Sequence, residues 1–187
     1  MRLFLSVIIL GVIVFACKKE DKIEVKQTSS KKLTYTVPQG WLTEKPATKM
    51  REAQFRLPGV DGERDAECAV FVFPGTGGTV QMNLKRWYGQ FKQPGGKSSE
   101  EVAELEKSIV NDLPITVTHV TGTYLKSMSP QMMSGPVEEN PGSALLAAVI
   151  ETPADPWFIK MVGPEKTVGH WRQSFYDLLS SVKYDVN

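Results

Sequence analysis

Three side chains of this sequence have the types needed for nucleophilic catalysis. Cys68 is a candidate nucleophile, and His119 and His170, the two histidines of the chain, are candidate bases. Because a thiol attacks as its thiolate, the base has to lie within hydrogen-bonding reach. Alternation places Cys68 on the same strand face as Val70 and Val72, which predicts a buried, inert thiol. A thiol-dependent enzyme using Cys68 with a histidine is kept as an alternative, and both histidines are expected to be structural.

Methionine sulfurs offer a second chemistry. Met128, Met132 and Met133 lie close together in the sequence, and thioethers are soft ligands that suit Cu(I). No histidine or cysteine lies beside them, so adaptable packing is the main interpretation and copper(I) buffering the alternative. The three belong to residues 126–142, a segment rich in Pro, Gly and Met that we predict to be a long loop. Long loops of compact domains are functional or mobile, so this one is the expected contact surface for a protein partner.

Two further segments have residues that could hold ions. Residues 71–79 are typical of a strand, a glycine turn and a helix start, whose free N–H groups could bind an anion. The Lys-Ser/Thr pair and the dinucleotide spacing are both absent. Alternating acids at residues 61–67 lack the spacing of a calcium loop. We therefore predict a structural turn and a solvated strand edge, with no metal, no cofactor and no catalytic constellation.

The elements that must position these residues follow from hydrophobic patterning. Strand 67–73 is apolar on both faces, which predicts a central strand covered on both sides. The order of elements predicts an α+β fold, an antiparallel sheet with helices on both faces, or α/β/α sandwich. Other strands are expected at residues 33–37, 53–57, 115–124, 143–151 and 157–162, and helices at 84–91 and 168–182, while 100–110 fits a helix or a strand.

The N-terminal residues have the anatomy of an export signal. Arg2 precedes an apolar run that ends at Phe15, shorter than the about 20 residues that a spanning helix needs. Residues 14–17, Val-Phe-Ala-Cys, resemble the bacterial lipobox. The resemblance implies cleavage before Cys17, diacylglycerol on its sulfur and acylation of the new amino group, which together anchor a protein stably. Because Lys18 follows the cysteine, we expect the outer membrane, facing the periplasm, with the inner membrane as the alternative.

Domain organisation and composition narrow the function further. We expect a signal peptide at residues 1–16, the lipidated cysteine and a flexible polar tether at 17–32, and a single domain at 33–187. Without residues 1–16 the chain has equal numbers of basic and acidic residues. Neutrality argues against a nucleic-acid partner, which requires a basic face. With Cys17 lipidated, Cys68 is left without a disulfide partner.

The domain resembles the Mog1/PsbP-like fold. The resemblance rests on residues 35–41 (Tyr-Thr-Val-Pro-Gln-Gly-Trp), on the helix carrying Trp87 after a Gly-rich turn, and on residues 158–164 (Phe-Ile-Lys-Met-Val-Gly-Pro) before the last helix. It covers nearly the whole domain. Members are mainly binding and scaffolding proteins, so the resemblance implies a lipid-anchored periplasmic binding or scaffold module without catalytic activity. No functional residue of the family aligns here, and none is carried over.

Overall fold

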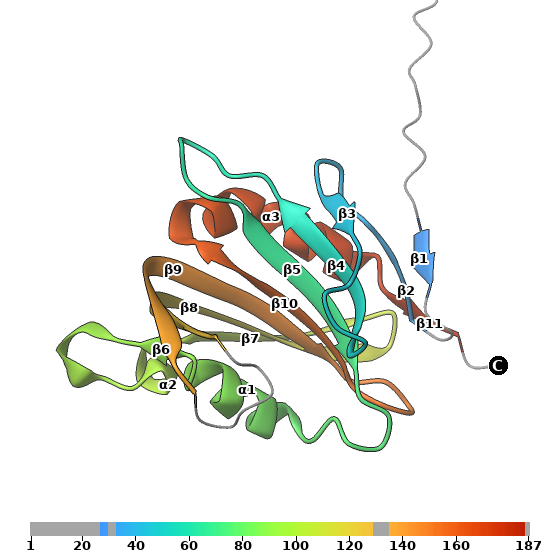
Figure 1. Ribbon diagram of the computed structural model, residues 1–187. Coiled ribbons are helices and arrows are strands. Elements are labelled where there is room, and N and C mark those ends of the chain that lie inside the picture. The colour runs from blue at the N-terminus through green and yellow to red at the C-terminus, as the bar shows by residue number, and fades with distance from the viewer. Residues whose placement is uncertain (1–26, 30–32, 129–134, 186–187) are drawn as a thin grey trace, which may run out of the picture.

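Two antiparallel sheets organise the chain (Figure 1). The computed structural model describes residues 27–29, 33–128 and 135–185. In these ranges the larger sheet has the strand order β3-β4-β5-β10-β9-β8-β6, with β7 also paired to β8, and the smaller has the order β1-β2-β11. The larger sheet contains β3 (Leu42–Glu44), β4 (Arg51–Leu57), β5 (Ala66–Val72), β6 (Phe91–Lys92), β7 (Glu104–Val110), β8 (Leu113–Ser127), β9 (Val137–Ile150) and β10 (Trp157–Pro164); the smaller contains β1 (Gln27–Ser29), β2 (Leu33–Thr36) and β11 (Lys183–Tyr184).

The first helix, α1 (Val80–Tyr88), begins directly after residues 71–79, which were predicted to end in a helix start, and so before the expected range of 84–91. The Thr79 side chain caps it by accepting a hydrogen bond from the N–H of Met82 at 3.3 Å. The helix ends at Gly89, a poor helix former, so Phe91 lies in β6 and not on the helix as expected. The other described helical segments are a 3-10 turn at Pro94–Gly96, α2 (Ser99–Val102) and α3 (Glu165–Ser180).

Residues 100–110, which fitted either a helix or a strand, form one of each. Ser98 and Glu101 make a reciprocal capping box that starts the single turn of α2, with hydrogen bonds of 3.3 and 3.2 Å. Strand β7 follows at Glu104 and pairs with β8 along its whole length. A helix-start signal and a strand pattern therefore follow each other within eleven residues. This stretch is too short for either helical or strand periodicity to dominate.

Helix α3 packs on one face of the main sheet, against β9 and β10, and also contacts β2. Val168, Phe175 and Leu178 point from it into the core, each at most 1% exposed. The predicted C-terminal helix is confirmed over these positions. Val182 is buried beyond the end of the helix, and Trp171 is only partly buried. We call this side of the sheet the closed face.

Helix α1 packs on part of the opposite side. Leu84, Trp87 and Tyr88 join a second buried cluster over β8, β9 and β10, and the Tyr88 hydroxyl lies 2.7 Å from Thr118 Oγ1. No residue of β4 belongs to this cluster. The fold is thus α+β, with a mostly antiparallel sheet and few helices, but the expected helical cover over both faces is not confirmed. We call the side that carries α1 the open face.

The prediction of a long loop at residues 126–142 is wrong at 126–127 and 137–142, which lie in strands. β8 continues to Ser127, and β9 begins at Val137 directly opposite it. Pro141 and Gly142, the turn signals in the sequence, lie where the β8–β9 register shifts, and Gly142 has φ +64. A bulge accommodates a proline, which has no N–H for the ladder, and a glycine in a left-handed conformation. Residues 129–134 lie outside the described part of the chain.

Strand β1 lies in the segment that was predicted to be a flexible tether. Residues 27–29, predicted to be a flexible linker, pair with β2, so the tether prediction is wrong at these positions. Strand pairing uses backbone groups, which carry no sequence signal in a polar segment. Residues 1–26, including the predicted signal peptide, lie outside the described residues. None of the described helices is both long and apolar enough to cross a membrane.

Candidate functional site

Cys68 lies on the closed face and is fully buried. Burial raises the pKa of its thiol, and the negative charge of Glu67 raises it further. Among the described residues, no histidine is hydrogen-bonded to its sulfur. The prediction of a buried thiol is confirmed, whereas the thiol-dependent enzyme stays an alternative.

The two histidines lie in separate places. His119 occupies β8, and its Nδ1 lies 3.4 Å from Glu104 Oε2, which also binds the Arg172 Nη2 of α3 at 3.1 Å. His170 is exposed on α3 and meets Trp171 edge-to-face at 4.9 Å. His119 therefore lies beside the ion pair of Glu104 and Arg172 that joins β7 to α3, and among the described residues neither histidine is hydrogen-bonded to Cys68.

The other sites expected from the sequence are only partly described. Met128 is exposed at the end of the β8–β9 hairpin, where its N–H donates to the Pro136 carbonyl at 3.0 Å. Met132, Met133 and Cys17 lie outside the described residues, so copper(I) buffering and lipidation stay predictions.

The glycine turn before α1 and the acids at residues 61–67 are held by local partners. The Gly75 N–H donates to the Asp155 carboxylate at 2.7 Å, so this N–H of the turn is already paired with a carboxylate. Asp65 accepts hydrogen bonds from Arg56 and from the Gly59 N–H, both at 2.7 Å, which hold its pKa below the usual range. Among the described residues, no group of three or more His, Cys, Asp or Glu side chains could hold a metal ion.

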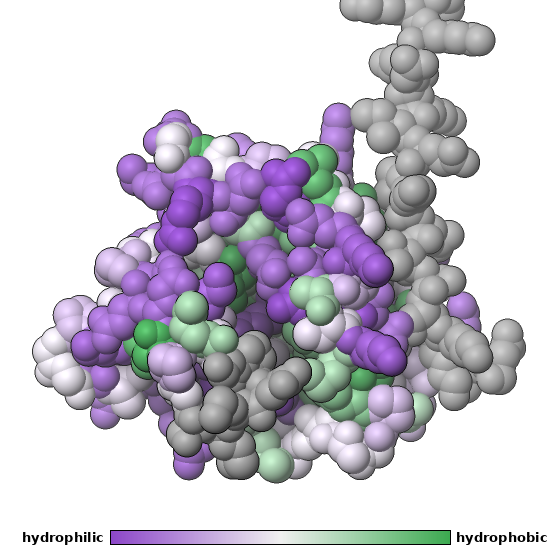
Figure 2. All heavy atoms as spheres, in the orientation of Figure 1, coloured by the Kyte–Doolittle hydropathy of each residue, from purple (hydrophilic) through white to green (hydrophobic). Residues whose placement is uncertain are grey.

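A pocket of about 490 Å³ opens on the open face, beside the region that α1 covers. Figure 2 shows it as a hollow bordered mainly by hydrophilic side chains. Its walls come from β4, β5, β8, β9 and β10, together with the segments before β5 and after α1. This volume is within the roughly 300–1,000 Å³ range of small-molecule sites, and most of its walls are strands of a sheet, which hold their side chains rigidly.

Lys160 stands on β10 where an apolar side chain would be expected. Ile159 and Met161 on either side of it are fully buried on the closed face, so alternation turns Lys160 to the open face. Its partners across the sheet are Ala69 on β5 and Ala147 on β9. Because these two neighbours are small, the space above the sheet is left to the lysine and to the hollow.

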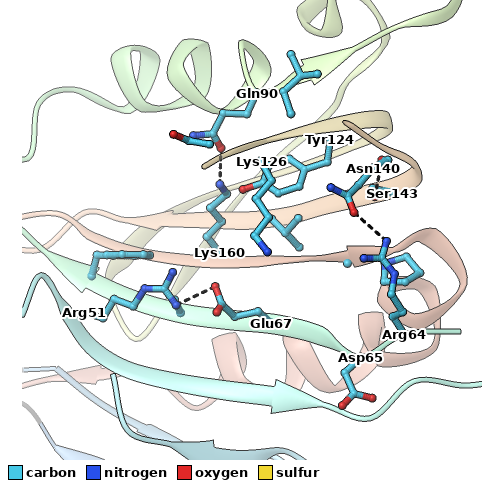
Figure 3. Close-up of a pocket in the computed structure, with 17 residues that line it drawn as sticks. Arg51, Arg64, Asp65, Glu67, Gln90, Tyr124, Lys126, Asn140, Ser143 and Lys160 are labelled. Atoms are coloured by element: carbon cyan, nitrogen blue, oxygen red, sulfur yellow. Dashed lines mark hydrogen bonds and ion pairs between the residues drawn. The ribbon is translucent and has the colours of Figure 1, made fainter. Parts of the chain in front are cut away.

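The ammonium of Lys160 has neutral partners. It donates to Gln90 Oε1, just beyond α1, and lies 5.5 Å from the centre of the Tyr124 ring (Figure 3). Burial lowers its pKa from 10.5 to about 8; the charge of Arg86 also lowers it, and that of Glu67 opposes the shift. At neutral pH this lysine is therefore mainly charged, although it is only partly exposed to water.

Two arginines mark opposite sides of the pocket (Figure 3). Arg51 on β4 forms an ion pair of 2.8 Å with Glu67 on β5, and its guanidinium carbon lies 5.8 Å from the Phe71 ring. Arg64 donates to Asn140 Oδ1 at 3.0 Å. The bulge in β9 turns Asn140 to the open face, and this is how the bulge contributes to the site.

Positive charge dominates the lining. The two acids of the pocket are each bound to an arginine, Glu67 to Arg51 and Asp65 to Arg56. Lys126 extends from β8 over the pocket in the view of Figure 3. The ionised side chains of the lining are Arg51, Arg64, Lys126 and Lys160 against Asp65 and Glu67.

Sequence reasoning missed this pocket entirely. The usable signal was Lys160, a single charge in the apolar run of residues 157–162, because a charge inside a buried strand requires a reason. Arg51, Arg64 and Lys126 give no such signal, since isolated cations are normal at strand ends and in turns. Only the strand order brings them together.

Comparisons with known proteins identify no activity. No protein-family model matches the chain, and no curated protein matches it. The chain is similar to the crystal structure of a protein of unknown function from Pseudomonas aeruginosa, with 10% identity and a TM-score of 0.46 over 75% of this chain and 94% of that one. It is also similar to the solution structure of a cyanobacterial PsbP (CyanoP) from Synechocystis, with 15% identity and a TM-score of 0.47 over 82% and 86%. We derive function from the residues of this chain.

Proposed function

We propose that this chain is a lipid-anchored periplasmic binding module without catalytic activity, with its binding site in the pocket on the open face. The observation that carries the proposal is Lys160, a charged and largely desolvated side chain in a ligand-sized hollow. A buried ammonium costs free energy that an apolar residue would avoid, so its presence indicates a role in binding.

The chemistry of the pocket supports binding over catalysis. Both carboxylates of the lining are held by arginines, which leaves neither placed as a proton-transfer partner for Lys160. The remaining polar groups include guanidinium, ammonium and amide groups. Such groups recognise and orient a bound molecule.

The binding surface extends to the end of the β8–β9 hairpin. Lys126 and Ser127 line the pocket, and Met128 follows them on the surface. Lys126 and Ser127, from the segment expected to contact a partner, therefore lie at the rim of the pocket, and a protein partner that docks on the open face would meet them first.

Site-specific photo-crosslinking tests where the module binds. The full chain would carry benzoylphenylalanine in place of Lys126 at the pocket rim or, as the control, in place of Gln173, which is exposed on α3. We expect adducts in native membranes from position 126 and none from position 173. Equal yields at the two positions, or adducts only from α3, would contradict the proposed site.

The proposed membrane localisation rests on the lipobox-like residues 14–17. Metabolic labelling with palmitate should mark the wild-type chain and leave Cys17→Ser unmarked, because the thioether forms on that sulfur. The variant should also leave the membrane fraction. If both chains fractionate identically, the anchor is absent, although the pocket would be unaffected.

The proposed fold is the Mog1/PsbP-like α/β/α sandwich that the sequence resemblance implies.

A further inference from the structure

The pocket contains cations that no carboxylate neutralises. Among the described residues, Lys160 and Arg64 form no ion pair, and each instead bonds the amide oxygen of a neutral side chain, Gln90 or Asn140. Arg51, by contrast, is matched by Glu67. Because an amide oxygen carries only a partial charge, a bound anion would be a stronger partner for both groups.

The same pocket has an apolar side. Phe71, Val162 and Pro164 line it, with Ala69 on its floor. Phe71 stacks on Phe73 with ring centres 6.0 Å apart, which fixes the orientation of this wall. A small inorganic anion would leave the partly exposed Phe71 and Val162 facing water, whereas a ligand with a short hydrocarbon part would cover them.

We propose that the pocket binds an amphipathic anion, with its carboxylate or phosphate held by Lys160, Arg64 adding positive charge from the far side of the pocket, and a short apolar segment against Phe71 and Val162. This inference rests on the proposed function, since it names the ligand class of that site. Lys126 is placed at the rim, where it attracts the anion. Gln90 holds the Lys160 ammonium toward the pocket in the absence of ligand.

Calorimetric titration of the full chain in phosphatidylcholine nanodiscs tests the ligand class. The probes are hexyl phosphate, hexanoate, inorganic phosphate and hexylammonium. We expect both hexyl anions to bind with submillimolar Kd, inorganic phosphate to bind about tenfold more weakly because it lacks the hydrocarbon part, and hexylammonium not to bind. Binding of hexylammonium as tight as that of hexyl phosphate would overturn the proposal.

Matched variants locate the site. Lys160→Met should weaken hexyl phosphate binding by about tenfold or more, the effect of losing one desolvated charged contact. Lys166→Met makes the same substitution at an exposed position of α3 and should leave the affinity unchanged. If Lys160→Met fails to fold, Arg64→Gln at the exposed end of the pocket should still weaken binding about threefold. Undiminished affinity in a folded Lys160→Met variant, or in Arg64→Gln where that variant replaces it, would overturn the proposal.

Two further results distinguish a lipid headgroup from a free anion as the ligand, and a wrong ligand class from a wrong binding face. Nanodiscs with phosphatidylglycerol would compete with hexyl phosphate if a lipid headgroup is the ligand and would not if a free anion is; either result supports the anion site. If no hexyl anion binds but crosslinking at position 126 persists, the ligand class is wrong and the binding face stands. If both fail, the binding face is wrong as well.

Discussion

The closed and open faces of the main sheet are made by the same strands but differ in chemistry. On β10, Ile159 and Met161 enter an apolar layer beneath α3, whereas Lys160 between them enters a charged hollow. On β5, Cys68 is sealed in the same layer while Ala69 forms the floor of the hollow. Apolar burial stabilises the fold, and a desolvated charge does not. We therefore expect stability to come mainly from the closed face, and we propose that the open face binds.

Thiol accessibility should show the largest contrast between the faces. In a Cys17→Ser chain Cys68 is the one remaining thiol, and we expect its labelling to be at least about a thousandfold slower than in the unfolded chain, because labelling requires opening of the core. Adding Lys126→Cys should create a thiol that labels at once. Rapid modification of native Cys68, followed by mass spectrometry, would revive the thiol-dependent alternative.

Truncating one phenylalanine on each face compares their contributions to stability. Phe175→Ala removes a fully buried side chain of α3 and should lower the free energy of unfolding by about 4 kcal/mol. Phe71→Ala removes a partly exposed ring from the pocket wall and should cost about 1 kcal/mol. Urea denaturation of both variants measures the difference, and equal losses would remove the distinction between the faces.

Lys160→Met should change the free energy of unfolding in the opposite direction and raise it. The folded chain lowers the pKa of Lys160 from 10.5 to about 8, so between these pH values the unfolded chain binds more protons and stability rises with pH. Below pH 8 the folded chain bears the full cost of desolvating the charged ammonium. We set this cost at about 2 kcal/mol, less than the pKa shift alone implies, because water reaches the pocket. Lys160→Met should therefore be more stable than wild type at pH 7, with the gap closing as pH rises to 10.5. A gap that does not change with pH would show that the ammonium is not desolvated.

Removal of the α1 cap should have a small effect that is confined to one face. Thr79→Ala removes the hydrogen bond to the Met82 N–H and should lower stability by about 1 kcal/mol. Since α1 covers only part of the open face, hydrogen exchange should accelerate in α1 and leave α3 unchanged. Faster exchange in both helices would mean that the two faces unfold as one unit.

Side-chain periodicity made the closed face predictable and left the open face largely hidden. Alternation around Cys68 and the helical spacing of Val168 and Phe175 report burial directly, because they depend on one local element. The pocket depends on strand order, which joins Arg51 to Glu67 and Arg64 to Asn140 across the sequence. Local residue types predict none of these pairings.

Two wrong predictions came from backbone effects. Pro141 and Gly142 are typical turn residues, and only the pairing of β8 with β9 shows that they make a bulge inside a strand. β1 at residues 27–29 forms through backbone hydrogen bonds in a polar segment. In both cases the tertiary partner overrides the local signal.

Carbon-13 NMR of the Lys160 Cε atom is the most direct test that the open face is built to hold an anion. Labelled lysine in the full chain, assigned with Lys160→Met, gives the pKa of this ammonium with and without hexyl phosphate. We predict a pKa near 8 in the free chain and a higher one in the complex, because a bound anion stabilises the charged form, with Lys166 unaffected. An ordinary value near 10.5 in both states would contradict it.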